Sequence, residues 1–315
     1  MIRAAICWTV LTVLCMAVFS PGLSQADERK DMEARLRMTV RFLAEEIGQR
    51  SFRDVEKLNR AAQFIEDSLR SARCVVSRQA FVYKDDTYYN IIGEVKGTGA
   101  DDEGIIVVGA HYDTVLGTPG ADDNASAVAG LIELARMTSE RPIRRTVRFV
   151  AFTLEEPPVF MTSRMGSHVY AKSLSEEGAK VYGMIALEML GFYSDEEGSQ
   201  YFPLPFFRLF YPTRGNFIAF VGNISSLPFT KRMQRAFRET STMPVESLNS
   251  PSIIPGVDFS DHRSFWKFGY RAFMVTDTAF YRNPNYHGPG DTADTLDYGK
   301  MAEVVTGLYK ALGTL

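Results

Sequence analysis

Histidine and acidic residues follow several apolar runs of this chain, at the points where those runs end. The clusters are His111-Tyr112-Asp113 after the run 104–110, Glu155-Glu156 after 145–153, Glu188 after 181–187, Asp122-Asp123-Asn124 nine residues beyond Asp113, and Tyr286-His287 near the C-terminus. Short continuous apolar runs are typical of buried parallel strands. The carboxyl ends of such strands line the crevice where open α/β sheets bind ligands. Histidine and carboxylate side chains bind divalent transition metals, so the clusters predict a metal site.

Each cluster taken singly has a more ordinary explanation. Asp123 could cap a helix that begins near Asn124, because aspartate is a preferred residue at that position. A Glu-Glu pair is usual on a solvated helix face, and a lone histidine near an aspartate occurs in many folds. The recurrence of these residues just past buried strands favours the metal site over these explanations.

The motifs together resemble peptidase family M28, the zinc exopeptidases of the bacterial leucyl aminopeptidase type. The resemblance covers residues 89–312, and the segments that carry it are GAHYDTV (109–115), PGADDNASAVAGLIELAR (119–136), FTLEE (152–156), ALEMLGF (186–192), FSDHRSFWKFGYRA (259–272) and YHGPGDTADTLD (286–297). It implies a peptide substrate and two zinc ions. The zinc ligands that it implies are His111, Asp123, Glu156, Glu188 and His287.

The same resemblance assigns roles to other residues. Asp123 would bridge the two ions, and Asp113 would accept a hydrogen bond from the His111 ring and fix its tautomer. Glu155 would take a proton from the attacking water and deliver it to the leaving amine. Tyr286 has two interpretations of equal weight: a hydrogen-bond donor to the oxyanion, or a packed loop tyrosine.

Two positions depart from the family pattern. Glu188-Met189 stands where the family usually has aspartate before methionine, and glutamate reaches one methylene further. Pro157-Pro158 follows Glu156 directly, and proline fixes φ, so the loop that carries Glu155 should be stiff.

Composition limits the remaining possibilities. The chain has 315 residues, of which 45% are hydrophobic, and this is enough for a large core in one α/β domain. The formal net charge is −3 and no basic run occurs, so the sequence gives no sign of nucleic-acid binding. The sequence does not define an oligomeric state.

Residues 1–26 have the organisation of a signal peptide, which leaves a single catalytic domain over 27–315. Arg3 supplies a positive charge, residues 4–19 are apolar, and Ser24-Gln25-Ala26 is a small-residue cleavage site. We therefore expect export to the periplasm or medium. The apolar stretch is short for a membrane span, although an uncleaved anchor is the alternative. Cleavage would leave Cys74 as the only cysteine and no intrachain disulfide.

Helices and strands alternate along the mature chain. Helices are expected near 31–48, 53–72, 125–137, 226–240, 262–268 and 299–312, and strands at 74–83 and 88–95 in addition to the three apolar runs. This order predicts a three-layer α/β/α sandwich with a mixed, mostly parallel sheet. The aromatic-rich segment 191–223 is expected to form a pocket wall or lid, with a partner-binding surface as the alternative.

Three functions of different classes fit the sequence. The first is a dizinc aminopeptidase. The second is an acyltransferase of the glutaminyl cyclase type, which has a similar fold and binds one zinc ion. The third is a non-catalytic binding relative. The complete set of five ligand types favours the first.

Overall fold

An eight-stranded mixed sheet forms the centre of the computed structural model, which describes residues 25–100 and 103–315. The strand order is β1-β2-β4-β3-β5-β8-β6-β7. The strands are β1 (Val75–Tyr83), β2 (Asp86–Val95), β3 (Ile105–His111), β4 (Val147–Phe152), β5 (Val181–Glu188), β6 (Ile218–Gly222), β7 (Val245–Asn249) and β8 (Ala272–Thr276). Four neighbouring pairs are parallel and three are antiparallel, which agrees with the predicted sheet.

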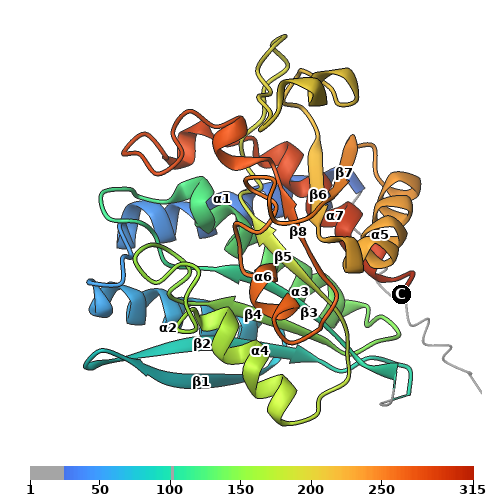
Figure 1. Cartoon of the computed structure of the whole chain (residues 1–315). Coiled ribbons are helices and arrows are strands. Elements are labelled where there is room, and N and C mark those ends of the chain that lie inside the picture. The colour runs from blue at the N-terminus through green and yellow to red at the C-terminus, as the bar shows by residue number, and fades with distance from the viewer. Residues whose placement is uncertain (1–24, 101–102) are drawn as a thin grey trace, which may run out of the picture.

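Helices cover both faces of this sheet, as Figure 1 shows. The helices are α1 (Gln25–Arg41), α2 (Val55–Ser71), α3 (Ala127–Glu140), α4 (Gly166–Glu176), α5 (Leu227–Thr240), α6 (His262–Trp266) and α7 (Tyr298–Leu312). One core cluster joins α1, α2, α3, α5 and α7 to the face that carries Ile185 and Leu187 of β5. A smaller cluster joins α4 and α6 to the opposite face, with Met184 and Ala186. The predicted α/β/α sandwich is confirmed.

The central strands are buried on both faces because they are parallel strands between two helical layers. From Ile106 to His111, every residue of β3 is buried, and the same holds for β5 from Gly183 to Glu188. In contrast, β1 is an antiparallel edge strand whose side chains are mostly exposed. The continuous apolar runs of the sequence therefore identified the central strands and their ends.

The predicted helices and strands agree with the structure to within a few residues, but α4, β6, β7 and β8 were not predicted individually, and β6 lies inside segment 191–223, which was expected to be irregular. Two local differences remain. The first helix begins earlier than expected, at Gln25, and its last turn (Phe42–Ile47) is π-helical. A second π-helical turn (Ala121–Ser126) precedes α3, so the regular helix begins at Ala127 rather than near residue 125.

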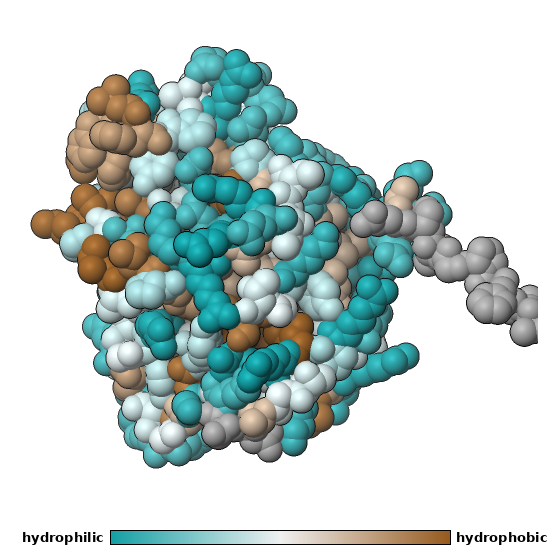
Figure 2. Space-filling model, turned by 90° about the vertical axis from the view of Figure 1, so that its right-hand side faces the viewer, coloured by the Kyte–Doolittle hydropathy of each residue, from teal (hydrophilic) through white to brown (hydrophobic). Residues whose placement is uncertain are grey.

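The segment between β5 and β6 is an excursion that projects at the top of Figure 1. Its only helical turn is 3₁₀ (Pro205–Leu209), and Leu209 and Phe210 are 80% and 73% exposed. Apolar side chains gather at the same height, at the upper left of Figure 2. The excursion has no regular secondary structure apart from this turn, and it lies at the β7 side of the sheet.

The predicted signal peptide falls almost entirely outside the described residues, as do Cys7 and Cys15. Within the described residues, no helix is long and apolar enough to cross a membrane. Cys74 is buried and free.

Candidate metal and catalytic site

The predicted site residues meet at one edge of the sheet because three parallel strands end there. His111 is the last residue of β3 and Glu188 is the last residue of β5. The register pairs Gly109 with Ala186, which brings His111 level with Glu188. Glu155 and Glu156 lie on the loop just past β4, the other neighbour of β3.

Asp123 reaches the same point from the loop between β3 and α3. Both carboxylate oxygens of Asp291 hold this loop: Oδ1 accepts the backbone N–H of Asp122 at 2.8 Å, and Oδ2 accepts that of Asp123 at 3.1 Å. The Asn124 side chain bridges to β5, donating to Leu187 O and accepting from the backbone N–H of Met189. Asp123 is therefore fixed by its backbone, and its carboxylate does not cap a helix.

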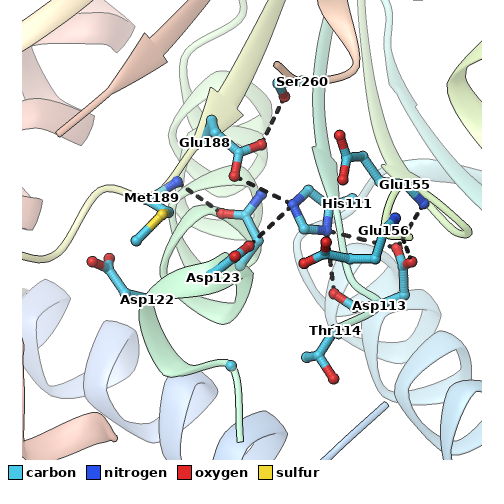
Figure 3. A network of polar contacts seen from close by, with 12 residues as sticks. His111, Asp113, Thr114, Asp122, Asp123, Glu155, Glu156, Glu188, Met189 and Ser260 are labelled. Atoms are coloured by element: carbon cyan, nitrogen blue, oxygen red, sulfur yellow. Dashed lines mark hydrogen bonds and ion pairs between the residues drawn. The ribbon is translucent and has the colours of Figure 1, made fainter. Parts of the chain in front are cut away.

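The Asp123 carboxylate lies between two histidines, one on each oxygen. Its Oδ1 is 3.4 Å from His111 Nε2, which is also 3.3 Å from Glu188 Oε1. Its Oδ2 is 3.2 Å from His287 Nε2, which is also 3.4 Å from Glu156 Oε2. The structure thus has two half-sites, each with one histidine and one glutamate, and Asp123 shared between them. Figure 3 shows the His111 half-site.

Burial of so many acids in one place changes their protonation. Burial and the neighbouring Asp123 raise the pKa of Glu156 to about 8. Burial lowers the pKa of His287, but Asp123 and Glu156 outweigh it and raise this pKa to about 10. The pKa of Glu155 is raised well above its usual value, by burial first and then by Glu156 and Glu188. The site has more buried carboxylates than histidines to neutralise them.

These residues fit a divalent metal. Asp123 Oδ1 and Glu156 Oε1 are buried, and neither has a hydrogen-bond partner among the described residues. His111, Asp123 and Glu156 each offer one ligand atom, and these atoms lie within 4.8 Å of one another across the two half-sites. Buried anionic oxygens without donors need a cation, and imidazole with carboxylate is a ligand set that suits Zn²⁺.

Asp113 has a different main contact from the one expected. Its Oδ1 is 3.6 Å from His111 Nδ1, beyond hydrogen-bond distance, and the ring nitrogen lies closer to the backbone oxygen of Asp113, at 3.2 Å. The carboxylate instead accepts the backbone N–H groups of Glu155 at 3.1 Å and Glu156 at 3.0 Å. Asp113 therefore holds the Glu155–Glu156 loop directly, and its contact with the His111 ring is the longer one.

A cavity of about 470 Å³ opens beside the half-sites, lined by Glu155, Tyr286 and His287 among others. The Glu155 carboxylate makes no hydrogen bond or ion pair within the described part of the chain, although its residue is only 5% exposed. The Tyr286 ring stacks on His287 with 3.8 Å between ring centroids. Its hydroxyl makes no hydrogen bond within the described residues either, so both groups are free to meet a substrate.

A second cavity, larger in total empty space (about 850 Å³, open solvent included), adjoins the first and shares Glu188, Phe259 and Tyr286 with it. The excursion supplies part of its wall, including Phe202, Phe207 and Tyr211. Segment 191–223 therefore lines this cavity, in agreement with the expected pocket wall, while a lid or a partner-binding surface stays a prediction.

Several residues that sequence reasoning missed position this site. Arg50 is fully buried and donates to five backbone oxygens, among them Tyr112 O at 2.8 Å and Gly120 O at 3.0 Å. It thereby joins the chain just after His111 to the loop that carries Asp123. Ser260 Oγ donates to Glu188 Oε2 at 2.7 Å. His262, two residues further on, is buried, and its Nε2 contacts Val257 O at 2.8 Å, so it is structural and no part of the half-sites.

Solved structures with this fold include a zinc aminopeptidase, BSAP, from Bacillus subtilis, with a TM-score of 0.70 and 17% identity over 89% of this chain and 94% of that one. They also include a glutaminyl cyclase from Bacteroides thetaiotaomicron, with a TM-score of 0.67 and 16% identity over 90% and 98%. At these identities the likeness shows the fold alone: an α/β/α fold shared by zinc aminopeptidases and a cyclase.

The chain belongs to peptidase family M28, whose model matches residues 90–311. The uncharacterized protein YfbL of Escherichia coli K12 is 43% identical over 286 residues, which cover 88% of this chain and 87% of that protein. A probable leucine aminopeptidase of Trichophyton verrucosum is 24% identical over 93% of this chain and 74% of that protein. The predicted fold, family and enzyme class are confirmed.

Proposed function

We propose that this chain is a dizinc aminopeptidase, which removes the N-terminal residue from peptides. The observation that carries the proposal is the shared Asp123 carboxylate, whose two oxygens face His111 and His287 separately. One ion would be held by His111, Glu188 and Asp123, and the other by His287, Glu156 and Asp123. The aminopeptidase relatives and the zinc aminopeptidase with the same fold support the peptide substrate and the metal.

Zinc, when bound, would polarise the scissile carbonyl and lower the pKa of water. The chain's own residues would do the rest. Glu155 lines the cavity, is buried and has a raised pKa, so it can take a proton from water and give it to the leaving amine. Tyr286 also faces the cavity, and its free hydroxyl can donate a hydrogen bond to the oxygen that becomes negative. Asp113 holds the loop that carries Glu155.

Asp123 provides the sharpest test of the metal arrangement. The purified chain, reconstituted with zinc, should contain two ions per chain by elemental analysis, and Asp123→Ala should weaken the binding of both. Asp85→Ala, an exposed residue in the turn between β1 and β2, is the matched control and should bind zinc normally. One tight ion in a fully active enzyme would refute the dinuclear proposal and favour the cyclase.

Activity separates the remaining alternatives. The zinc-loaded enzyme should hydrolyse peptides with a free N-terminus and leave N-acetylated copies intact. Cyclisation of N-terminal glutaminyl peptides without hydrolysis would identify a cyclase. Absence of both reactions, with two ions bound, would identify a non-catalytic binding relative.

We also propose that the chain is exported, with residues 1–26 as the signal and 27–315 as the catalytic domain. The composition of the N-terminal segment supports this proposal: a positive charge, an apolar stretch and a small-residue cleavage site. N-terminal sequencing of protein recovered from cell fractions tests it. A cytoplasmic protein that retains Met1 would contradict it.

A further inference from the structure

The floor of the larger cavity is formed by β8, β6 and β7, on the sheet face opposite α5. In β7, Ser247 points to the other face, where its Oγ donates to Gln234 of α5. Side chains alternate along a strand, so Glu246 and Leu248 point away from α5 and line the cavity. The small cluster of α4 and α6 contacts β8 but leaves most of β6 and all of β7 uncovered. A sheet face that the described helices leave largely uncovered thus becomes the floor of the cavity.

Two carboxylates stand at opposite ends of one row of this floor. The register pairs Glu188 with Thr276, Thr276 with Ala219, and Ala219 with Glu246. Residues paired across a sheet point to the same face, and all four of these line the cavity. Thr276 and Ala219 are small, so short, buried side chains form the floor between the two glutamates.

The Glu246 carboxylate makes no hydrogen bond or ion pair in the described structure. It is half-buried, and burial raises its pKa. The charges of Arg238 and Lys231 lower this pKa in part, but neither residue forms a hydrogen bond or ion pair with Glu246: Lys231 donates to Gln234 and Ser247, and Arg238 donates to Val245 O. Among the described residues, no lysine, arginine or histidine lines the cavity, and Glu188 and Glu246 are the only charged ones that do. A half-buried carboxylate in such surroundings lacks the donor that would offset its lost hydration.

The walls suit a long side chain that ends in a cation. They are aromatic, with Phe202, Phe207, Phe259 and Phe280 among the lining residues. Lysine and arginine side chains pack their methylene stems on apolar surface and keep a charged end free to pair. Cations also bind favourably over aromatic rings. An apolar cavity with a carboxylate at one end differs from a pocket for a leucine side chain, which needs no charge there.

The dimensions of the row agree with an extended basic residue. Three strand spacings separate Glu188 from Glu246, about 14 Å in all. In an extended lysine, the α-amino and side-chain nitrogens are six bonds apart, about 7.5 Å. A hydrogen bond of about 2.8 Å at each end brings the span to about 13 Å. The reacting end of the substrate would lie at Glu188 and the side-chain cation at Glu246.

We propose that Glu246 selects peptides whose N-terminal residue is lysine or arginine, by accepting a charge-assisted hydrogen bond from the side-chain cation. The proposal rests on the aminopeptidase function proposed above and specifies its substrate class.

The test compares lysyl substrates with norleucyl substrates, because norleucine has the four-carbon side chain of lysine without the ammonium. The kcat/KM of the zinc-loaded wild type should be higher for lysyl and arginyl amides than for norleucyl amide. In Glu246→Gln the lysyl-to-norleucyl ratio should fall on the order of 10–100-fold, the usual worth of a hydrogen bond to a charged group. Turnover of norleucyl amide should persist, which also shows that the variant is folded.

Glu239→Gln removes the same charge from an exposed position on α5, outside the cavity, and should leave the ratio unchanged. A Glu246→Gln ratio equal to that of the wild type, with norleucyl amide hydrolysed by both, would overturn the selectivity while the aminopeptidase function stands. Equal falls in Glu239→Gln and Glu246→Gln would also overturn it, because the effect would then be one of net charge. Failure of the wild type to hydrolyse any free-amine substrate would instead refute the proposed function itself.

Discussion

Asp113 provides a quantitative test of how the catalytic loop is held. Its carboxylate accepts the backbone N–H groups of Glu155 and Glu156 at 3.1 and 3.0 Å, in a fully buried position. Asp113→Asn keeps the shape but leaves one oxygen for two donors. The amide NH₂ then faces a backbone N–H, so one hydrogen bond to a charged acceptor is lost and a buried donor stays unsatisfied.

A hydrogen bond to a charged group contributes roughly 1.5–3 kcal/mol, so we expect Asp113→Asn to lower the free energy of unfolding by about 2 kcal/mol. For a chain of 315 residues, that corresponds to a fall in Tm of roughly 3 °C. Turnover should fall more steeply, on the order of 10–100-fold, because Glu155 would no longer be held in place and a displacement of about 1 Å can reduce rates 100-fold.

The assay is thermal unfolding in the presence of a chelator, followed by kcat measurements at saturating zinc. Metal is removed first so that the difference in Tm reflects the loop hydrogen bonds without a contribution from zinc binding. Asp85→Asn, exposed in the β1–β2 turn, is the control and should leave Tm unchanged. If metal-free Asp113→Asn melts with the wild type and loses only zinc affinity, Asp113 acts through the His111 ring and the argument from the loop is wrong.

Three further substitutions follow from the same geometry. Glu155→Gln should keep fold and zinc while kcat falls roughly 10²–10⁴-fold, and near-wild-type turnover with metal bound would show that another group is the base. Glu188→Asp should keep zinc but raise KM for free-amine substrates more than it lowers kcat, and a collapse of kcat at unchanged KM would reduce Glu188 to a metal ligand. Arg50→Met leaves buried backbone oxygens without donors and should lower the free energy of unfolding by about 3 kcal/mol or more. The control Arg60→Met, at an exposed position, should change it little. Equal melting temperatures of the two variants would contradict the stabilising role of Arg50.

The sequence alone predicted the central strands and the histidine and acidic clusters at their ends, because these signals are local. A buried parallel strand is a continuous apolar run, and a ligand at its end is the next polar residue, as at His111 and Glu188. Once parallel neighbours are assumed, their ends must meet, so the cluster follows without knowledge of the remaining structure. The assignment of five of these residues as zinc ligands came instead from the family resemblance: His111, Asp123, Glu156, Glu188 and His287.

The supporting contacts could not be predicted, because they depend on pairings distant in sequence. Arg50 donates to backbone oxygens, and a backbone oxygen has no residue identity that a sequence could reveal. Asp113 was assigned to His111 because they are two residues apart, yet its partners lie 42 and 43 residues away. The sequence also gave Glu246 no role, since β7 is a five-residue edge strand and its alignment with Glu188 depends on three successive strand registers.

The fold separates the chemistry of this enzyme from its choice of substrate. The proposed metal ligands come mainly from the ends of β3, β4 and β5, strands packed between helices on both faces, and such strands give little freedom to the side chains at their ends. The larger cavity lies over β8, β6 and β7, where the described helices leave β7 and most of β6 uncovered on the cavity side, with the irregular excursion as its wall. Loops tolerate substitution and changes of length better than buried strands do. Changes in the excursion or in β7 can therefore alter the pocket without moving Asp123 or its two histidines, which is why we assign selectivity to Glu246 and catalysis to the strand ends.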